Sequence, residues 1–403
     1  MGGGVTAGAA GLYAALVTNP AQMGARPEDA DELKHHLKNG KGFKNPWDSF
    51  VDFMTWKVPF QMIWRKISGQ WHVPDTTPPT VPVRTPDFLP SRYTPHLRAT
   101  WLGHACYYIE FPGGLRVLFD PVFEDCCAPI NLKNFKRFTP PPCEIEDLPI
   151  VDAVVISHNH YDHLSHPTIL RIQKKFPNAQ FFAPLGNKKW FLDCGVTKIT
   201  ELDWWEQRKL RLEVQKTEDE GSSSPGDLKA NPETMTAIIG ALPCQHFSAR
   251  GLFDRCQTLW ASWSVESGGS KVYFAGDTGY RTVPRLPPNT DDYSPSLNLP
   301  HCPAFSQIGS LRGPFDLGLI PIGAYEPRWI MSSIHANPKD SVNIFLDTKC
   351  RKALGMHWGT WVLTEEDVME PPQKLKEALA EKGIGEKGVF DVVDIGESKV
   401  LES

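Results

Sequence analysis

The sequence lacks any long hydrophobic run, any basic excess and any regular spacing of cysteines. No stretch reaches the roughly 18 apolar residues that a membrane-spanning helix requires, so no such helix is expected. The 42 Lys and Arg residues are outnumbered by 47 Asp and Glu residues, and the formal net charge is −5. A protein dedicated to nucleic acid usually carries a basic excess, so no nucleic-acid partner is expected.

The nine cysteines are odd in number, and two of them, Cys126 and Cys127, are adjacent. This pattern is not typical of a disulfide framework and indicates a reduced, intracellular chain. The 403 residues are enough for one large α/β domain with an extension, or for two modest domains. Residues 1–6 fit the loose pattern for N-myristoylation, although a flexible glycine-rich end is the favoured alternative.

Residues 1–95 are expected to form an N-terminal extension to a catalytic domain at 96–403. Within the extension, residues 47–71 combine many aromatic side chains with basic neighbours, which suits a membrane interface containing anionic lipid. The alternative is that the aromatics pack on the catalytic domain, and both can hold on two faces of one segment. The prolines of residues 74–95 preclude helix and sheet interior, so an extended strap is expected there.

From residue 97 onward, short apolar runs that end in polar residues indicate strands, with helical patterns between them. The expected strands cover residues 98–102, 106–111, 115–119, 152–157, 179–183, 236–242, 258–265, 271–275, 317–322 and 352–356. The expected helices cover residues 167–176, 187–193, 338–347 and 372–382. This succession predicts an α/β fold of two sheets sandwiched between helices. Residues 216–234 and 284–304 are expected to be long inserted loops.

The run HNHYDH at residues 158–163 follows a short apolar strand. A strand that stops in a ligand-rich loop is a rigid platform for a metal, and imidazole and carboxylate are ligands suited to zinc. His158 and His160 are two residues apart and can point the same way from an extended backbone. Asp162 and His163 lie beyond the turn, where they can reach a second ion. A surface histidine cluster without metal is the alternative.

Three further candidate ligands stand at the ends of expected strands: His246, Asp277 and His357. Each one alone is more readily interpreted as a satisfied polar residue at a strand end. Together with the run they complete two sets, which are His158, His160 and His246 for one ion, Asp162, His163 and His357 for the other, and Asp277 between them. A bridging carboxylate holds two ions roughly 3.5–4 Å apart, where a shared water becomes hydroxide near neutral pH.

This order of ligands resembles the metallo-β-lactamase superfamily. Within it, further motifs look like those of the N-acylphosphatidylethanolamine-hydrolysing phospholipase D family, over about residues 43–372. The motifs are KNPW at 44–47, TWLGHA at 100–105, FDP at 119–121, SHNHYDHL at 157–164, GDTGY at 276–280, IPIGAYEPRW at 320–329 and MHWGT at 356–360. The resemblance implies a metallo-β-lactamase αββα sandwich with an N-terminal extension. The two inserted loops and the N-terminus depart from the family pattern and put lipid selectivity in doubt.

The resemblance also implies a zinc-dependent hydrolase that cleaves N-acylphosphatidylethanolamine into N-acylethanolamine and phosphatidic acid. Two Zn²⁺ ions and the hydroxide between them are the implied cofactor and nucleophile, with Asp162 both a ligand and a catalytic residue. Tyr161 and His335 match family positions that contact the substrate phosphate. We further expect His335 to help protonate the departing oxygen. Asp120 is expected to orient a ligand histidine, with a turn residue before Pro121 as the alternative.

The expected partner is a phospholipid at a membrane surface, reached by peripheral attachment through residues 47–71. The sequence does not determine the oligomeric state, and a homodimer is one possible assembly. Fungal relatives of the family are associated with mitochondria, and this location also stays open. The acidic residues Glu28, Asp29, Asp31 and Glu32 are not typical of a transit peptide.

Three alternatives to this function are kept. The nearest is another hydrolase with the same metal site, such as a sugar-phosphate lactonase, for which the aromatic segment would have no use. A nuclease is disfavoured by the acidic charge balance and by the absence of a basic arm. The non-enzymatic alternative is a lipid-binding protein with a structural zinc site.

Overall fold

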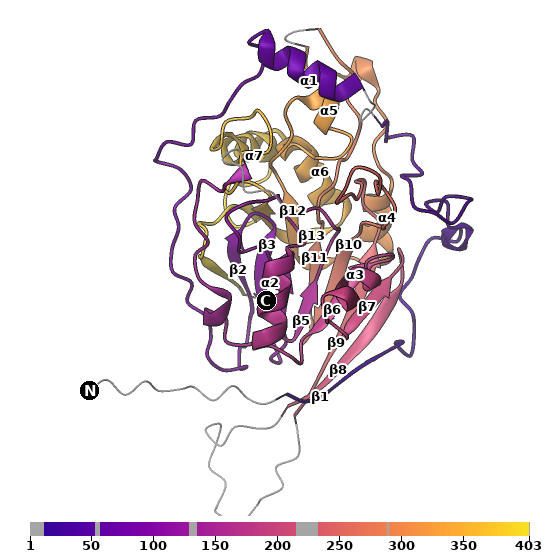
Figure 1. Cartoon of the computed structure of the whole chain (residues 1–403), viewed down its shortest axis with the longest axis vertical. Coiled ribbons are helices and arrows are strands. Elements are labelled where there is room, and N and C mark those ends of the chain that lie inside the picture. The colour runs from indigo at the N-terminus through magenta and orange to yellow at the C-terminus, as the bar shows by residue number, and fades with distance from the viewer. Residues whose placement is uncertain (1–11, 53–56, 129–134, 215–232, 288–289, 403) are drawn as a thin grey trace, which may run out of the picture.

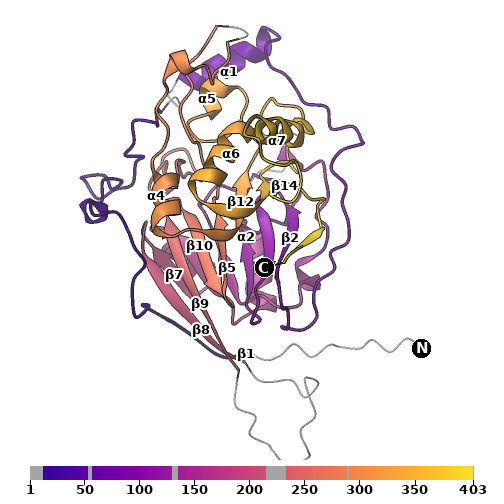
Figure 2. The ribbon, with the colours of Figure 1, turned by 180° about the vertical axis from the view of Figure 1, so that it is seen from behind.

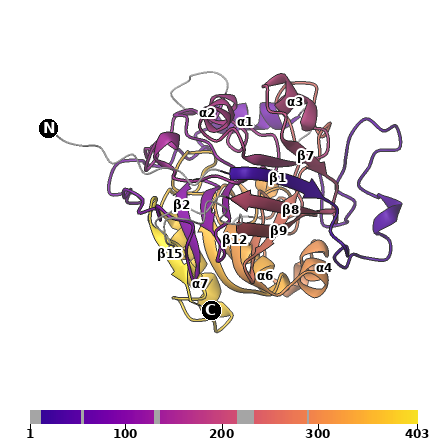
Figure 3. The ribbon, with the colours of Figure 1, turned by 90° about the horizontal axis from the view of Figure 1, so that it is seen from below.

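The computed structural model describes residues 12–52, 57–128, 135–214, 233–287 and 290–402. Two β-sheets lie face to face, and helices cover the outer face of each sheet (Figures 1 and 3). The expected α/β sandwich with outer helical layers is therefore confirmed. No helix in the described part of the chain combines the length and the apolar character needed to cross a membrane.

The larger sheet has eight strands. In spatial order they are β1 (Leu12–Thr18), β8 (Gln207–Val214), β9 (Glu233–Leu242), β10 (Ser262–Ser267), β11 (Ser270–Phe274), β12 (Phe315–Pro321), β13 (Cys350–Met356) and β14 (Phe390–Asp391). The pairs from β1 to β11 are antiparallel, and those from β11 to β14 are parallel. As a result, β9, β11, β12 and β13 all end at the same edge of the sheet.

The smaller sheet has seven strands. In spatial order they are β15 (Ser398–Leu401), β2 (Leu97–Gly103), β3 (Cys106–Glu110), β4 (Arg116–Phe119), β5 (Ala153–Val155), β6 (Gln180–Pro184) and β7 (Ile199–Leu202). The pairs from β15 to β4 are antiparallel, and those from β4 to β7 are parallel. The carboxyl ends of β4 and β5 therefore lie side by side.

The outer helices are placed by their caps and by their apolar faces. The smaller sheet is covered by α2 (His166–Lys175) and α3 (Lys188–Asp193), and the larger sheet by α4 (Ala304–Leu311), α6 (Pro338–Asp347) and α7 (Glu370–Glu381), as Figures 2 and 3 show. Ser165 caps α2 by accepting the Thr168 N–H, and Asn337 caps α6 by accepting the Asp340 N–H. Two further helices, α1 (Lys57–Ile67) and α5 (Arg328–Met331), lie at the top of the view in Figure 1.

The core fills the space between the two sheets. Period-two alternation along β4 turns Val117 and Phe119 toward the larger sheet, and Leu118 toward α2 and α3. Phe119 meets Phe274 of β11 with ring centroids 4.8 Å apart, which joins the sheets directly. Each such buried side chain contributes about 1.5–3 kcal/mol relative to an exposed one. The strands that position the site are therefore held in place by apolar packing.

The described part of the N-terminal extension packs along the catalytic domain. It contributes β1, which pairs with β8 at the edge of the larger sheet. His35 and His36 both contact the carboxylate of Asp203, with nitrogen–oxygen distances of 2.7 Å. The Trp47 ring stacks on Trp204 with centroids 5.3 Å apart. The alternative interpretation of segment 47–71, in which its aromatics pack on the domain, therefore applies to Trp47.

Most of the expected elements appear near their expected bounds, and the differences have local reasons. Strand β10 begins at Ser262 instead of 258, because the N–H groups of Leu259 and Ala261 donate to the carbonyls of Leu185 and Ser157 outside the sheet. Strands β1, β7, β8, β14 and β15 and helices α1, α4 and α5 were not among the expected elements.

The expected loops and strap divide between described and undescribed residues. Residues 74–95 contain no helix or strand, as expected. The expected loop at 216–234 is two residues too long, because β9 begins at Glu233, and residues 216–232 lie outside the described part of the chain. The described residues of 284–303 form a loop interrupted by one 3-10 turn at Pro295–Leu297. Residues 1–6 and 53–56 also lie outside the described part.

Candidate metal centre

The expected ligands gather at the edge where the parallel strands of both sheets end. Strand β5 leads into residues 157–163, and β9 ends four residues before His246. Strand β11 ends three residues before Asp277, and β13 ends immediately before His357. Carboxyl ends of parallel strands meet at one edge of a sheet, which is where ligands bind in open α/β folds. The structure brings all seven expected ligands together at this edge.

The first expected set consists of three histidines whose ring nitrogens converge. His160 Nδ1 lies 2.8 Å from His158 Nε2 and 3.3 Å from His246 Nε2. Each of these rings is buried or nearly so, and the three nitrogens are close enough together to bind one cation.

The second expected set forms beside the first. Asp162 Oδ2 lies 3.4 Å from His163 Nε2 and 3.6 Å from His357 Nε2. A further histidine that was not among the expected ligands, His104, contacts the same oxygen at 3.0 Å. His104 follows the expected strand at 98–102 and lies in the motif TWLGHA, but it was not selected as a ligand from the sequence.

Asp277 lies between the two sets, as expected. Its Oδ2 atom is 3.1 Å from His163 Nε2 and 3.0 Å from His357 Nε2. The same oxygen is 3.8 Å from the Nε2 atoms of both His158 and His246. Burial opposes ionisation of this carboxyl, but His163 and His357 outweigh it and hold its pKa well below the usual value. One ionised oxygen is therefore within reach of cations held by either set.

Asp120, at the end of β4, holds the ligand loop from behind. Its Oδ1 accepts the Ser157 N–H (2.7 Å), and its Oδ2 accepts the Ser157 hydroxyl (2.5 Å) and the His163 Nδ1–H (2.7 Å). Because Ser157 donates its hydroxyl proton to Asp120, it accepts from His158 Nδ1 at 2.8 Å. His158 and His163 therefore both turn Nε2 toward the centre. Through these hydrogen bonds Asp120 can orient a ligand histidine, as expected from the sequence.

Three residues around the centre have left-handed backbone. The φ angles are 52° at His104, 37° at Asp120 and 63° at His357. Left-handed backbone is uncommon for residues other than glycine, and it persists where the surrounding structure determines it. His104 is fixed by its N–H, which donates to Thr360, and by its carbonyl, which accepts from His357 N–H and Trp101 Nε1.

The donor set fits a pair of divalent metal ions. Among the described residues, His163 Nε2, His357 Nε2 and Asp277 Oδ1 are buried and have no hydrogen-bond partner. Leaving buried polar groups unpaired costs free energy unless they bind something. His246 donates its Nδ1–H to the Ile334 carbonyl (2.9 Å), so its Nε2 also faces the centre. Imidazole and carboxylate donors of this kind suit zinc and related transition metals.

A pocket of about 510 Å³ opens above the centre. Its floor is formed by ligand residues, and its walls are largely apolar, with Ile330, Met331 and Ile334 on one side. Helix α1 contributes Val58 and Met62 to the same pocket. The centre therefore faces a cavity that suits an apolar or amphipathic molecule.

His335 and Tyr161 occupy different surroundings. His335 lines the pocket, and its ring lies 5.0 Å from the ring of His357. Burial lowers the pKa of His335 to about 3, so the ring is neutral at pH 7. Tyr161 instead lines a separate cavity of about 390 Å³, and its hydroxyl donates to the Arg250 carbonyl (3.1 Å). Contact of Tyr161 with a substrate phosphate stays a prediction.

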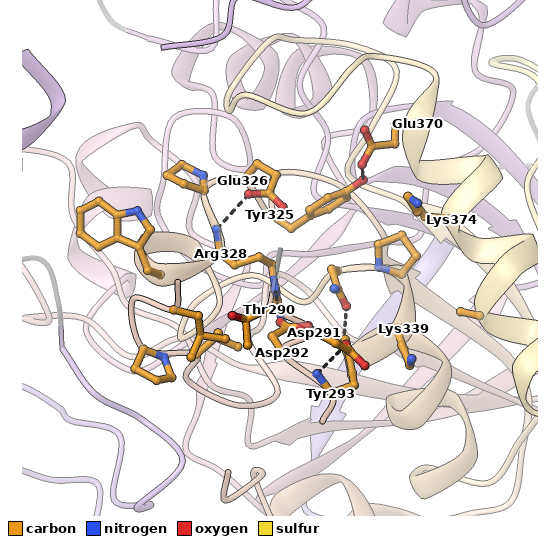
Figure 4. Close-up of a pocket in the computed structure, with 18 of the residues that line it drawn as sticks. Thr290, Asp291, Asp292, Tyr293, Tyr325, Glu326, Arg328, Lys339, Glu370 and Lys374 are labelled. Atoms are coloured by element: carbon orange, nitrogen blue, oxygen red, sulfur yellow. Dashed lines mark hydrogen bonds and ion pairs between the residues drawn. The ribbon is translucent and has the colours of Figure 1, made fainter. Parts of the chain in front are cut away.

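A larger cavity of about 780 Å³ is drawn in Figure 4. Trp329 of α5 lines this cavity, whereas Ile330 lines the pocket above the centre. The charged groups of the larger cavity pair with their neighbours. Arg328 contacts Asp292 at 3.0 Å, and the backbone N–H of Arg328 donates to Glu326. The metal-ligand cluster is outside this cavity, so the reactive centre belongs to the smaller pocket.

Comparison with known proteins places the chain in a family. Residues 115–358 match the family model described as a beta-lactamase superfamily domain. The chain is 35% identical to N-acyl-phosphatidylethanolamine-hydrolyzing phospholipase D 1 of Caenorhabditis elegans, over 91% of this chain and 94% of that protein. The chain belongs to the N-acylphosphatidylethanolamine-hydrolysing phospholipase D family.

Other similar proteins match shorter parts of the chain. The mitochondrial phospholipase D of the same name from Saccharomyces cerevisiae is 34% identical, over 70% of this chain and 52% of that protein. An uncharacterized protein of Mycobacterium tuberculosis is 35% identical, over 69% of this chain and 63% of that protein. Because the present chain belongs to this family, it is a hydrolase of the metallo-β-lactamase superfamily. The matched range 115–358 includes all seven expected ligands.

Proposed function

We propose that this chain hydrolyses N-acylphosphatidylethanolamine to N-acylethanolamine and phosphatidic acid, with two zinc ions as cofactors. The observation that carries the proposal is the convergence of seven donor residues, four of which line the floor of an apolar-walled pocket. Family membership supports it, because the C. elegans and yeast relatives are named for this activity. A phosphodiester group can bind at the metal ligands while its acyl chains contact the apolar walls of the pocket.

The residues of the chain divide the work among binding, orientation and exclusion of water. Bound zinc ions would supply a Lewis acid for the phosphate oxygens and lower the pKa of a water. His158, His160 and His246 would hold one ion, and Asp162, His163 and His357 the other, with Asp277 contacting both. Asp120 keeps His163 in the tautomer that leaves Nε2 free for metal.

His335 is placed to contact the substrate directly. It lines the pocket beside the ligand residues, and its Nδ1 is buried without a hydrogen-bond partner among the described residues. A neutral imidazole carries one N–H, which can donate to a phosphate oxygen as negative charge develops there. We assign His335 to binding of the substrate phosphate.

We also propose that the protein attaches peripherally to membranes through α1. Ile63, Trp64 and Ile67 are 55–75% exposed, while Val58 and Met62 of the same helix line the pocket. Lys66 lies on the exposed surface next to them. An amphipathic helix with an outward aromatic and basic face suits an anionic bilayer surface.

The decisive test is mass spectrometry of the products formed from a mixed phospholipid extract, with and without a chelator. The expected products are N-acylethanolamine and phosphatidic acid, and the chelator should abolish both. A phosphorylated lactone should be assayed in parallel. Turnover of the lactone with no phospholipid product would assign the site to a lactonase, and no turnover of either compound would favour a non-enzymatic protein.

A further inference from the structure

A short loop at residues 247–256 carries two apolar side chains that protrude from the surface. Leu252 and Phe253 are each 91% exposed. No other large apolar side chain in the described part of the chain is as exposed. Single exposed apolar residues are common, but two adjacent ones at the tip of a held loop form an interaction surface.

The base of this loop is held against the metal-ligand loop. The Arg250 guanidinium lies 4.0 Å from the Tyr161 ring centroid, and its Nη1 donates to the carbonyls of Asn159 and Leu164, each at 2.8 Å. The Asp254 carboxylate accepts the backbone N–H of Arg250 at 3.1 Å. The protruding tip is therefore in a fixed position relative to the catalytic ligands.

The loop also borders the substrate pocket and the approach to α1. Phe247 lines the pocket, and its ring contacts the His160 ring with centroids 4.6 Å apart. Arg255 pairs with Asp52, which precedes α1 by five residues, at 2.6 and 3.0 Å. Because Phe247 and α1 line the same pocket, the base of the loop and the inner face of α1 both border it.

Basic side chains lie beside the base of the loop. The backbone N–H of Phe43 donates to the Cys256 carbonyl (2.8 Å), which places residues 41–44 beside the base of the loop. Lys41 and Lys44 are both exposed there. Apolar side chains next to lysines are the combination that binds an anionic lipid surface.

We propose that the 247–256 loop is a second bilayer anchor, in which Leu252 and Phe253 enter the acyl boundary of the membrane beside the pocket mouth. The inference rests on the proposed function, since a lipid substrate is what brings the pocket to a bilayer. With α1 as the first anchor, two apolar contacts border one pocket. A lipid can then pass from the bilayer to the metal centre without crossing water.

The test compares a Leu252→Ser/Phe253→Ser variant with a matched control. The control is Leu16→Ser/Val400→Ser, which removes exposed apolar side chains from edge strands β1 and β15. Strand β1 lies at the opposite end of the molecule from α1 in Figures 1 and 2. Both zinc-loaded, full-length proteins are sedimented with phosphatidylcholine vesicles containing phosphatidylserine. We expect the loop variant to bind about tenfold more weakly than wild type, and the control to bind as wild type does.

Three further measurements separate the possible failures. Phe253→Trp should retain vesicle binding, because tryptophan also partitions to membrane interfaces. This result would show that the protein tolerates substitution at the tip and that binding requires a side chain with affinity for the interface. Wild-type vesicle affinity in the loop variant would overturn the proposal. So would conversion of a dimer to a monomer with vesicle binding unchanged, since the tip would then bind a second copy. Weaker vesicle binding in a protein that hydrolyses no lipid would retain the anchor and reject the proposed function.

Discussion

At the scale of single residues, the geometry of the metal centre depends on groups that lie behind the donor atoms. Asp120 is not one of the seven expected ligands, yet three hydrogen bonds connect it to Ser157 and His163. An ionised carboxylate can accept all three hydrogen bonds because both of its oxygens are acceptors and it carries no proton. An amide at this position would turn an NH₂ group toward one of the donors.

We therefore expect Asp120→Asn to lower zinc affinity about 10–100-fold, because His163 loses its orienting acceptor. Competition with a chelating dye measures this affinity. Asp152→Asn is the matched control, since Asp152 is equally buried but pairs with Arg92 (2.7 and 2.8 Å). Equal zinc affinity in both variants would show that Asp120 does not orient a ligand.

Substituting His335 should separate substrate binding from metal binding. Because His335 offers an N–H to the phosphate where charge develops, His335→Ala should lower kcat about 10²-fold while zinc content is retained. Turnover and metal content are measured on the same sample. His166→Ala, an exposed histidine beside the ligand loop, serves as the control. Unchanged turnover in His335→Ala would discard the role.

Glu326 provides a pH test away from the metal. Burial raises its pKa from the usual 4.5 to about 7. The folded state thus binds this proton more tightly than the unfolded chain does. The resulting stabilisation is complete below pH 4.5 and is lost as the pH rises through about 7. Glu326→Gln keeps an acceptor for the Arg328 N–H (3.1 Å) and does not titrate.

Accordingly, the Tm of Glu326→Gln should rise relative to wild type by a few °C across this pH window and level off above it. Differential scanning calorimetry in a pH series measures the effect. Glu377→Gln is the control, because pairing with Lys374 lowers the pKa of this exposed carboxyl below the window. A Tm difference independent of pH would show that Glu326 is not protonated in the folded protein.

At the scale of elements, α1 has two faces of different character. Val58 and Met62 line the pocket, whereas Trp64 and Ile67 face solvent. The helix is attached to the domain through Arg65, which pairs with Glu365 at 2.5 Å. A helix anchored in this way can present its outer face to a bilayer while its inner face remains against the substrate.

Replacing that outer face should uncouple the protein from vesicles. Trp64→Ser/Ile67→Ser should weaken vesicle flotation about tenfold, and turnover of vesicle-borne lipid should fall more than turnover of a monomeric short-chain lipid. Leu192→Ser/Leu346→Ser, which removes comparably exposed side chains from α3 and α6, is the control. Flotation equal to wild type would leave α1 as a wall of the pocket with no membrane role.

At the scale of the whole molecule, the metal centre joins the two sheets. Its donors come from the ends of β5 in the smaller sheet and of β9, β11 and β13 in the larger one. A cation bound here binds the folded state, because the donors come together only when the sheets pack. Metal binding should therefore stabilise the entire sandwich.

Chelation should lower the Tm of the protein, and added zinc should restore it. At a hundredfold excess over Kd, one bound ion contributes about 2.7 kcal/mol of stability. Calorimetry with a chelator, followed by back-titration with zinc, gives the measurement. Magnesium is the comparison ion, because it prefers oxygen ligands and should not replace zinc at a histidine-rich site. A Tm that ignores both chelator and zinc would contradict a metal centre.

Local patterns in the sequence were enough for much of this architecture. The spacing within residues 158–163 and the strand ends before Asp277 and His357 indicated the ligands, and the structure brings those residues together. The patterns failed where the signal was weak. No strand was expected at Leu12–Thr18, but β1 forms there because the edge of β8 offers backbone groups for pairing. His104 follows an expected strand in the same way as His246 and His357, but it was not selected.

The amino-acid sequence by itself determined the alternating strands, the helix caps and the chemical identity of the donors, because these depend on neighbours a few residues apart. Only the tertiary structure decided that His104 contacts Asp162, that Tyr161 faces Arg250, and that Leu252 and Phe253 protrude beside the pocket. Those outcomes depend on residues distant in the chain, whose approach follows from the packing of one sheet on the other.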